Sequence, residues 1–146
     1  MKGLKSDPRS NIAQPPIEAE ESLQDCIFCT KPDSEFFCQD DHFVAIFDAH
    51  PISLGHALVI PKAHGENFFE LDAVSGAALY GFIKFTKEIL DSRFQPDGFN
   101  IGINSGRAAG QTIFHTHIHV IPRYLGDVGD PRGGVRTIFP QSARYW

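Results

Sequence analysis

The chain has 146 residues, of which 42% are hydrophobic and 13 are phenylalanine, enough for one domain with a compact core. Its formal net charge of −5 excludes the basic surface typical of proteins that bind duplex nucleic acid or anionic lipid. No apolar run is long enough to span a membrane and residues 1–24 lack the apolar region of a secretory signal, so we expect a cytoplasmic protein without membrane partners.

The N-terminal third predicts a tail followed by three strands. Residues 1–24 are polar and contain three prolines, so we expect a flexible tail before a domain formed by residues 25–146. A short strand is predicted over residues 35–38 and a loosely alternating one over residues 42–47. After a break at Asp48 to Pro51, a largely buried strand is predicted over residues 56–61, which end at a proline.

The remaining elements are one helix and two strands. Apolar residues recur at three- and four-residue steps over residues 70–93, which predicts an amphipathic helix. A turn at residues 96–98 precedes a strand over residues 99–104, a loop rich in glycine and alanine, and a strand over residues 115–121. The predicted class is α+β: an antiparallel β-sheet with one long helix and short helical segments.

Three histidines alternate with strand-forming residues in the run His115-Thr116-His117-Ile118-His119. Alternate side chains of a strand share a face, so the pattern predicts a row of three imidazoles. Four strand steps separate the outer two by about 13 Å, too far for all three to hold one ion or one phosphate. The row is therefore expected to serve two neighbouring sites. A purely structural role explains it poorly, because neutral imidazoles are costly to bury without partners.

The loop that leads into this row has the character of an anion site. Small residues such as Gly106 and Gly110 let backbone N–H groups approach a phosphate, and Gln111 and Thr112 add side-chain donors. The loop alone could be an ordinary hairpin turn. Followed directly by the histidines, it indicates a phosphate site.

Cys26 and Cys29 form a C-x-x-C pair in a chain that shows no sign of export. Such a pair is compatible with a metal site, a redox pair or packed thiols rather than with structural disulfides. A closed zinc site needs two further ligands, for which Cys38 and His42 are candidates.

Residues 110–123 resemble the signature of the histidine triad (HIT) family, in which three histidines alternate with apolar residues. Residues 47–64, with a Gly-His strand and a Pro-Lys-x-His turn, are similar to the family's other hallmark. The resemblance covers about residues 26–123. Two residues depart from the family pattern: Thr116 is less apolar than the usual spacer between the histidines, and Leu54 stands where a proline often precedes the Gly-His pair. It implies a HIT-like fold in a homodimer whose sheet is continuous across both subunits.

The resemblance implies a nucleotide-binding hydrolase that acts at an α-phosphate. His117 would be the nucleophile and would form a nucleotidyl-histidine intermediate, a role that suits neutral imidazole. His119 would bond phosphate oxygens and help to transfer protons, supported by His56. The other implied substrate contacts are Asn104, Gly110, Gln111 and Thr112 for phosphate, Asp48 for the ribose hydroxyls, and Phe28, Ile27 and Phe47 as apolar surface for the base.

Some branches of the family also pair the C-x-x-C cysteines with the Pro-Lys-x-His histidine and the first triad histidine. The implied structural zinc ligands are then Cys26, Cys29, His64 and His115. This set would assign His115 to zinc and leave the other two triad histidines for phosphate. Packed thiols without metal are the alternative.

Dinucleoside polyphosphates and nucleoside phosphoramidates are the implied substrates. The alternatives are a nucleotide-binding signalling module with negligible turnover, a nucleotidyltransferase, and a metallohydrolase in which all three histidines bind catalytic metal. For the homodimer, Gly76, Ala77, Ala78 and Gly81 give the predicted helix a patch of small residues. These residues could equally pack on the helix's own sheet.

Overall fold

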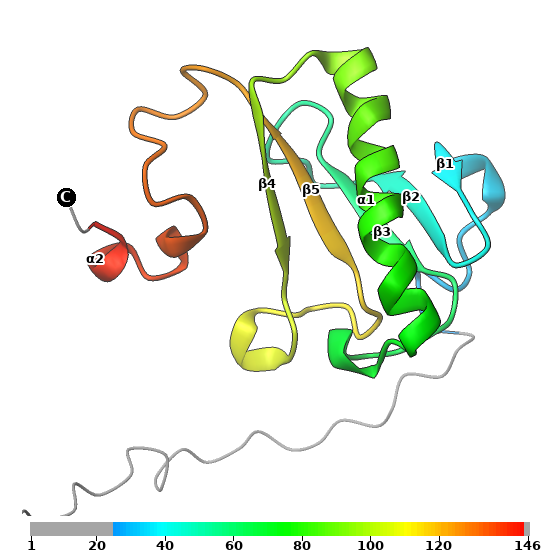
Figure 1. Cartoon of the computed structure of the whole chain (residues 1–146). Helices are drawn as coiled ribbons and strands as arrows, with labels where there is room; N and C mark the ends of the chain where they lie inside the picture. Colours follow the sequence, from blue (N-terminus) through cyan, green and yellow to red (C-terminus); the bar gives the residue numbers. More distant parts are fainter. Residues whose placement is uncertain (1–24, 145–146) are drawn as a thin grey trace, which may run out of the picture.

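The computed structural model describes residues 25–144, and the predicted tail over residues 1–24 lies outside them. Five antiparallel strands form one sheet in the order β1-β2-β3-β5-β4, with the long helix α1 on one face (Figure 1). This arrangement confirms the predicted α+β class. The strands are β1 (Cys38–Gln39), β2 (Phe43–Phe47), β3 (Ala57–Pro61), β4 (Gly98–Ile103) and β5 (Ile118–Arg123), and the helices are α1 (Ala73–Phe94) and α2 (Pro140–Ala143).

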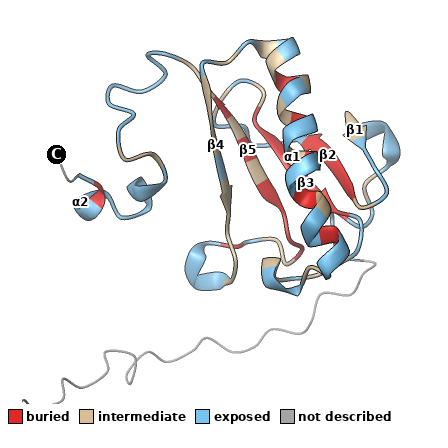
Figure 2. Cartoon of the chain, in the orientation of Figure 1, coloured by how far each residue is buried: buried red, intermediate tan, exposed pale blue. Residues whose placement is uncertain are grey.

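Alternation along the strands divides the buried side chains into two clusters, one on each face of the sheet. The cluster on the helix side consists of Phe43, Ala45, Ala57, Val59, Ile118 and Val120 with Leu79, Phe82 and Leu90 of α1. The cluster on the opposite face consists of Val44, Ile46, Leu58 and Ile60 with Cys26 and Phe28. Because both faces are covered, β3 is buried along its whole length (Figure 2).

Helix α1 begins and ends within three residues of its predicted bounds, for local reasons. Asp72 is the N-cap, and its carboxylate accepts hydrogen bonds from the backbone N–H groups of Val74 and Ser75 at 2.9 and 3.0 Å. After Phe94, Gln95 adopts a left-handed φ of 50°, which terminates the helix. Within the described residues, no helix combines the length and apolar character needed to cross a membrane.

Two predicted strands are placed differently in the structure. Asp33–Glu35 forms a 3₁₀ turn and β1 starts only at Cys38, so the strand predicted over residues 35–38 is wrong except for its last residue. The strand predicted from His115 starts at Ile118. The N–H of Thr116 donates to the carbonyl of Gly65 at 2.7 Å, which holds this segment out of the ladder. Strands β2 and β3 each start one residue later than predicted, and β4 starts and ends one residue earlier.

Candidate active site and metal centre

His117 is buried just before β5, on the sheet face opposite α1, and its ring is held in one tautomer. Its Nδ1 lies 2.8 Å from the backbone carbonyl oxygen of His115. A carbonyl oxygen can only accept, so Nδ1 carries the proton and Nε2 presents a lone pair. Phe28 packs edge-on against the ring, with centroids 5.3 Å apart. The backbone thus leaves the lone pair of Nε2 on His117 available.

His119, on β5, and His56, just before β3, form a chain of hydrogen bonds. The N–H of Ile52 donates to Nδ1 of His56 at 3.3 Å, so the proton of neutral His56 sits on Nε2. That nitrogen lies 3.0 Å from Nδ1 of His119 and donates to it. His119 therefore carries its own proton on Nε2, and its ring centroid is 5.2 Å from that of His117. The site therefore combines an imidazole lone pair, on His117, with a neighbouring N–H donor, on His119.

Both supporting histidines are held neutral. Burial, the largest cause, and the neighbouring His117 and His56 lower the pKa of His119 to about 4, against the opposing effect of Asp48. Burial also lowers the pKa of His56, again opposed by Asp48. Near neutral pH the chain of hydrogen bonds therefore contains uncharged imidazoles.

Asp48 follows β2 and is fixed to the strand beside it. Its backbone N–H donates to the carbonyl of His56 at 2.9 Å, and its Oδ1 accepts from the N–H of His50 at 2.8 Å. Oδ2 lies 3.5 Å from Nε2 of His56. The turn before His56 needs Gly55, whose φ is +82° and whose Cβ would lie 2.7 Å from the ring of Phe94. Asp48 thus offers Oδ2 as an acceptor beside the histidines.

The four predicted zinc ligands come together in one cluster. The ligand atoms of Cys26, Cys29, His64 and His115 all lie within 4.8 Å of one another. The sulfurs of Cys26 and Cys29 are 3.4 and 3.5 Å from Nδ1 of His115, and Cys29 is 3.4 Å from Nδ1 of His64. Tetrahedral zinc with usual bond lengths separates its ligand atoms by roughly 3.6 Å. The spacing of this cluster therefore fits a zinc ion.

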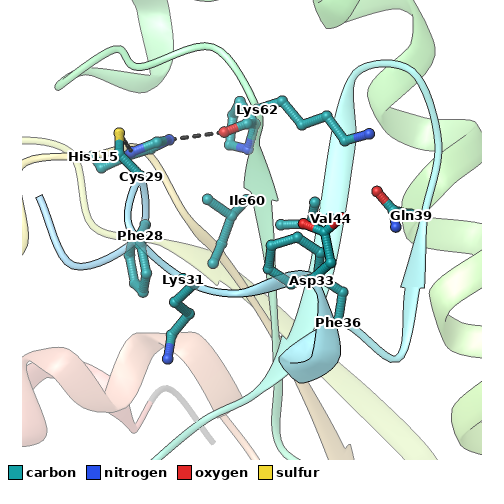
Figure 3. A pocket seen from close by; sticks show the side chains of 11 residues that line it. Phe28, Cys29, Lys31, Asp33, Phe36, Gln39, Val44, Ile60, Lys62 and His115 are labelled. Atoms are coloured by element: carbon teal, nitrogen blue, oxygen red, sulfur yellow. Dashed lines mark hydrogen bonds between the residues drawn. The ribbon is translucent and has the colours of Figure 1, made fainter. Parts of the chain in front are cut away.

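The surroundings of His115 also fit a metal ligand. Its Nε2 donates to the carbonyl oxygen of Pro61 at 2.8 Å, drawn as a dashed line in Figure 3, so Nδ1 turns its lone pair to the thiols. The rival ligands lie elsewhere. Cys38 contacts Thr86 across 3.8 Å, and His42 packs against its neighbour Phe43.

A second group of ligand-type atoms, from Asp48, His56 and His119, is equally compact. Two histidines and a carboxylate can hold a transition metal. A metal on Nε2 of His56 would, however, move that residue's proton to Nδ1, against the N–H of Ile52. Metal-bound histidines normally donate their second N–H to an acceptor. This group is therefore suited to hydrogen bonding with a substrate rather than to metal binding.

The predicted phosphate loop is closed by the side chain of Gln111. Its Oε1 accepts from the N–H of Gly106 at 2.8 Å, and its Nε2 donates to the carbonyls of Glu66 and Ile113 at 2.6 and 3.1 Å. Gly110 ends a 3₁₀ turn with a φ of 85°. Thr112 is exposed, and Asn104 is half-buried at the start of the loop.

A cavity of about 320 Å³ adjoins the metal cluster, with Cys29 and His115 at one end and Gln39 at the other (Figure 3). Phe28 lines it and packs edge-on against His115 and His117. Phe47, expected beside the base, packs instead against Phe37 and Phe94 on the helix side of the sheet. The cavity has an apolar floor and a polar rim. Its other lining residues are Lys31, Asp33, Phe36, Val44, Ile60, Pro61 and Lys62.

Comparison with known proteins gives matches over most of the chain. The family model of the HIT domain matches residues 30–126. The chain is 38% identical over 111 residues to adenylylsulfatase HINT3 of Arabidopsis thaliana, across 73% of this chain and 56% of that protein. It therefore spans little more than half the length of this relative. It is also 38% identical to protein hit of Bacillus subtilis, across 77% of this chain and 79% of that protein.

Comparison with solved structures also finds proteins of the HIT family. A Zn-bound histidine triad family protein from Mycobacterium smegmatis is 34% identical with a TM-score of 0.66, and the match covers 73% of this chain and 80% of the other. A member of the HIT family from Bacillus subtilis is 35% identical with a TM-score of 0.65, and the match covers 72% and 77% of the two chains.

Proposed function

The chain belongs to the histidine triad (HIT) family, and we propose that it hydrolyses nucleotides at the α-phosphate through a nucleotidyl intermediate on His117. The tautomer of this residue is the observation that carries the proposal. The Nδ1–H group donates a hydrogen bond to the His115 carbonyl, so the lone pair of Nε2 is free to attack beside the N–H donor of His119. No metal is required for that activation.

The reaction divides into two displacements. First, Nε2 of His117 bonds to the α-phosphorus while the bond from phosphorus to the leaving group breaks, and the electron pair departs with the leaving group. The N–H of His119 donates to a phosphate oxygen or to the leaving group, where negative charge develops. Water then attacks the phosphorus, the electron pair of the P–N bond returns to Nε2, and a water proton passes to solvent. Nδ1 keeps its proton throughout.

The residues around the two histidines suit a nucleotide. Oδ2 of Asp48, 3.5 Å from Nε2 of His56, can accept hydrogen bonds from the hydroxyls of a ribose. Asn104, Thr112 and backbone N–H groups of the loop would contact the phosphate, while Gly110, whose N–H donates to the carbonyl of Arg107 at 3.0 Å, would allow the close approach of the backbone. Phe28 offers aromatic surface for the base without a hydrogen-bonding pattern that would select one base. We therefore expect stricter selection of ribose and phosphate than of base.

Cys26, Cys29, His64 and His115 would hold one structural zinc ion. Bound zinc would join three segments: the C-x-x-C pair, the turn after β3 that contains His64, and His115. The backbone carbonyl of His115 in turn accepts the hydrogen bond from His117. Four protein ligands complete a tetrahedral site and leave no open position for substrate. The similarity to a family member whose structure is Zn-bound supports this assignment.

The substrate classes expected are dinucleoside polyphosphates and nucleoside phosphoramidates, and the similarity to an adenylylsulfatase adds adenylyl sulfate. A turnover panel of these three and a nucleotide sugar tests the function. Multiple turnovers that release a nucleoside monophosphate would support hydrolysis. Nucleotide binding without turnover would instead identify a binding module, and product formation only with a second acceptor would identify a nucleotidyltransferase.

We also propose a homodimer formed through α1 and β4. In the sheet of the described residues β4 is an edge strand, and Ile101 on it is 44% exposed. On α1, Tyr80 is 77% exposed. Apart from the adjacent residues and the nearby backbone of α1 itself, a Cβ added at Gly76 or Gly81 would meet no described atom within 4 Å, so these glycines do not pack on their own sheet. In the proposed homodimer, a second copy of this chain would pack into the space beside these two glycines.

A further inference from the structure

We propose that Gln111 is a positioning residue that ties the phosphate loop to residues 65–67, the strap that follows the metal-cluster residue His64, and does not itself touch phosphate. The inference rests on the proposed function, since the loop's role as a phosphate site belongs to that proposal. It differs from the role implied by the family resemblance, in which the Gln111 amide contacts the phosphate.

The polar atoms of Gln111 already have backbone partners. The side chain is only 5% exposed. Its oxygen accepts from Gly106, and the two hydrogens of its amide nitrogen are accounted for by the carbonyls of Glu66 and Ile113. No amide hydrogen is left for a ligand. The N–H groups of Gly106, Ala109, Gly110 and Gln111 are themselves bonded within the loop. A phosphate would therefore be met by the other backbone N–H groups of this segment, in a loop whose shape Gln111 fixes.

The strap is bonded to the loop region at three consecutive residues. The carbonyl of Gly65 accepts from the N–H of Thr116 at 2.7 Å. The carbonyl of Glu66 accepts from Gln111 at 2.6 Å. The side chain of Asn67 accepts from Ser105 at 2.8 Å. Gln111 makes the central link, so the segment after His64 and the phosphate loop are held as one unit.

The loop needs such a link because its own backbone is permissive. Gly106 and Gly110 have φ values of 88° and 85°, and glycine reaches many other conformations at similar cost. Without Gln111, the N–H of Gly106 and the carbonyls of Glu66 and Ile113 would lose their partner. The loop amides would then no longer be arranged before substrate binds, and preorganised donors are what stabilise charge in phosphoryl transfer.

The test compares Gln111→Met with wild type and with Gln141→Met, a matched exchange at an exposed position of α2. Hydrogen exchange of the Gly106 amide is measured by NMR in the ligand-free protein, AMP binding by calorimetry, and kcat and KM with the best substrate. We expect faster Gly106 exchange and a roughly 10- to 10²-fold loss of both AMP affinity and kcat/KM in Gln111→Met only. The zinc content should not change.

A second variant separates the two halves of the link. Gln111→Glu keeps an oxygen for the N–H of Gly106 but places its other oxygen against the carbonyls of Glu66 and Ile113. We expect protected Gly106 exchange with weakened AMP binding. If Gln111→Met does not fold, wild-type AMP affinity in Gln111→Glu would still overturn the proposal.

Two results would overturn the proposal. One is weakened AMP binding in Gln111→Met with unchanged Gly106 exchange, which would make the side chain a direct ligand. The other is wild-type AMP affinity in either variant. A wild-type protein that binds AMP but turns over no nucleotide would refute the proposed function, while the exchange and binding measurements would still decide the role of Gln111.

Discussion

Nδ1 of His117 lies 2.8 Å from the backbone carbonyl oxygen of His115. The two side chains belong to different sites, since His115 points its Nδ1 at two thiols and His117 has Nε2 available for chemistry. One hydrogen bond therefore joins the metal cluster to the proposed nucleophile. The division of the histidine row between two neighbouring sites, predicted from the sequence, is part of the proposed function.

Zinc content tests the metal cluster. Protein purified without a metal-affinity tag should contain about one zinc per chain by elemental analysis, and Cys26→Ser/Cys29→Ser should contain none. We expect a lower kcat in the double variant, because His115 and its carbonyl would no longer be fixed. Cys38→Ser is the matched control and should keep its zinc, since Cys38 lies against Thr86. Metal-free wild-type protein, or zinc retained by the double variant, would refute the assignment.

The low pKa of His119 predicts how stability depends on pH. Its pKa is about 4 in the folded protein against an ordinary 6.5. As pH falls through this window the unfolded chain binds a proton and the folded chain does not, so the free energy of unfolding decreases. Above pH 6.5 this contribution is constant. Lowered pKa values of His56 and His115 act in the same direction.

Urea denaturation at both ends of this window measures the effect. His119→Gln removes the titrating group and should lose less stability on acidification than wild type. An identical pH dependence for the two proteins would show that His119 titrates normally in the folded state.

Asp48 is expected to select the ribose. Wild-type kcat/KM should drop by about 10²-fold or more for a 2′,3′-dideoxy substrate, because the carboxylate of Asp48 would be left without the hydroxyls that it is placed to bond. An exchange of adenine for guanine should matter less. Asp48→Ala should erase the ribose preference, and Asp48→Asn, which keeps an acceptor oxygen, should retain part of it. Equal wild-type turnover of ribo and dideoxy substrates would exclude this role.

The dimer is open to a direct measurement of mass. Light scattering at micromolar concentration should give twice the 16.2 kDa of one chain. Ile101 lies on the exposed edge of β4. Ile101→Glu should shift the protein to monomer, because it would place an unpaired charge in the proposed subunit interface. A wild-type mass near that of one chain would remove the dimer from this account.

The elements predicted well are those whose form is decided locally. Strand β3 follows from its apolar run, which ends at Pro61, and helix α1 follows from its hydrophobic period. The start of β5 could not be read in this way. The N–H of Thr116 bonds to Gly65, a residue far away in sequence whose proximity no local pattern indicates.

The same distinction holds in the site. Residue types and the family resemblance predicted the cluster of Cys26, Cys29, His64 and His115. They did not predict the roles of the Ile52 N–H or the Pro61 carbonyl, since backbone groups leave no mark in residue identity. The contacts that occupy the Gln111 amide depend on how the loop folds back, and the sequence analysis missed them for that reason.

Turnover by His117→Ala at saturating substrate is the measurement that tests the central claim most directly. Removal of the nucleophile should lower kcat by about 10⁴-fold or more, as for other enzymes that act through a covalent intermediate. AMP binding should persist, because Asp48 and the loop donors remain. If His117→Ala retains a substantial fraction of the wild-type kcat on the best substrate, His117 is not the nucleophile and the proposed mechanism is wrong.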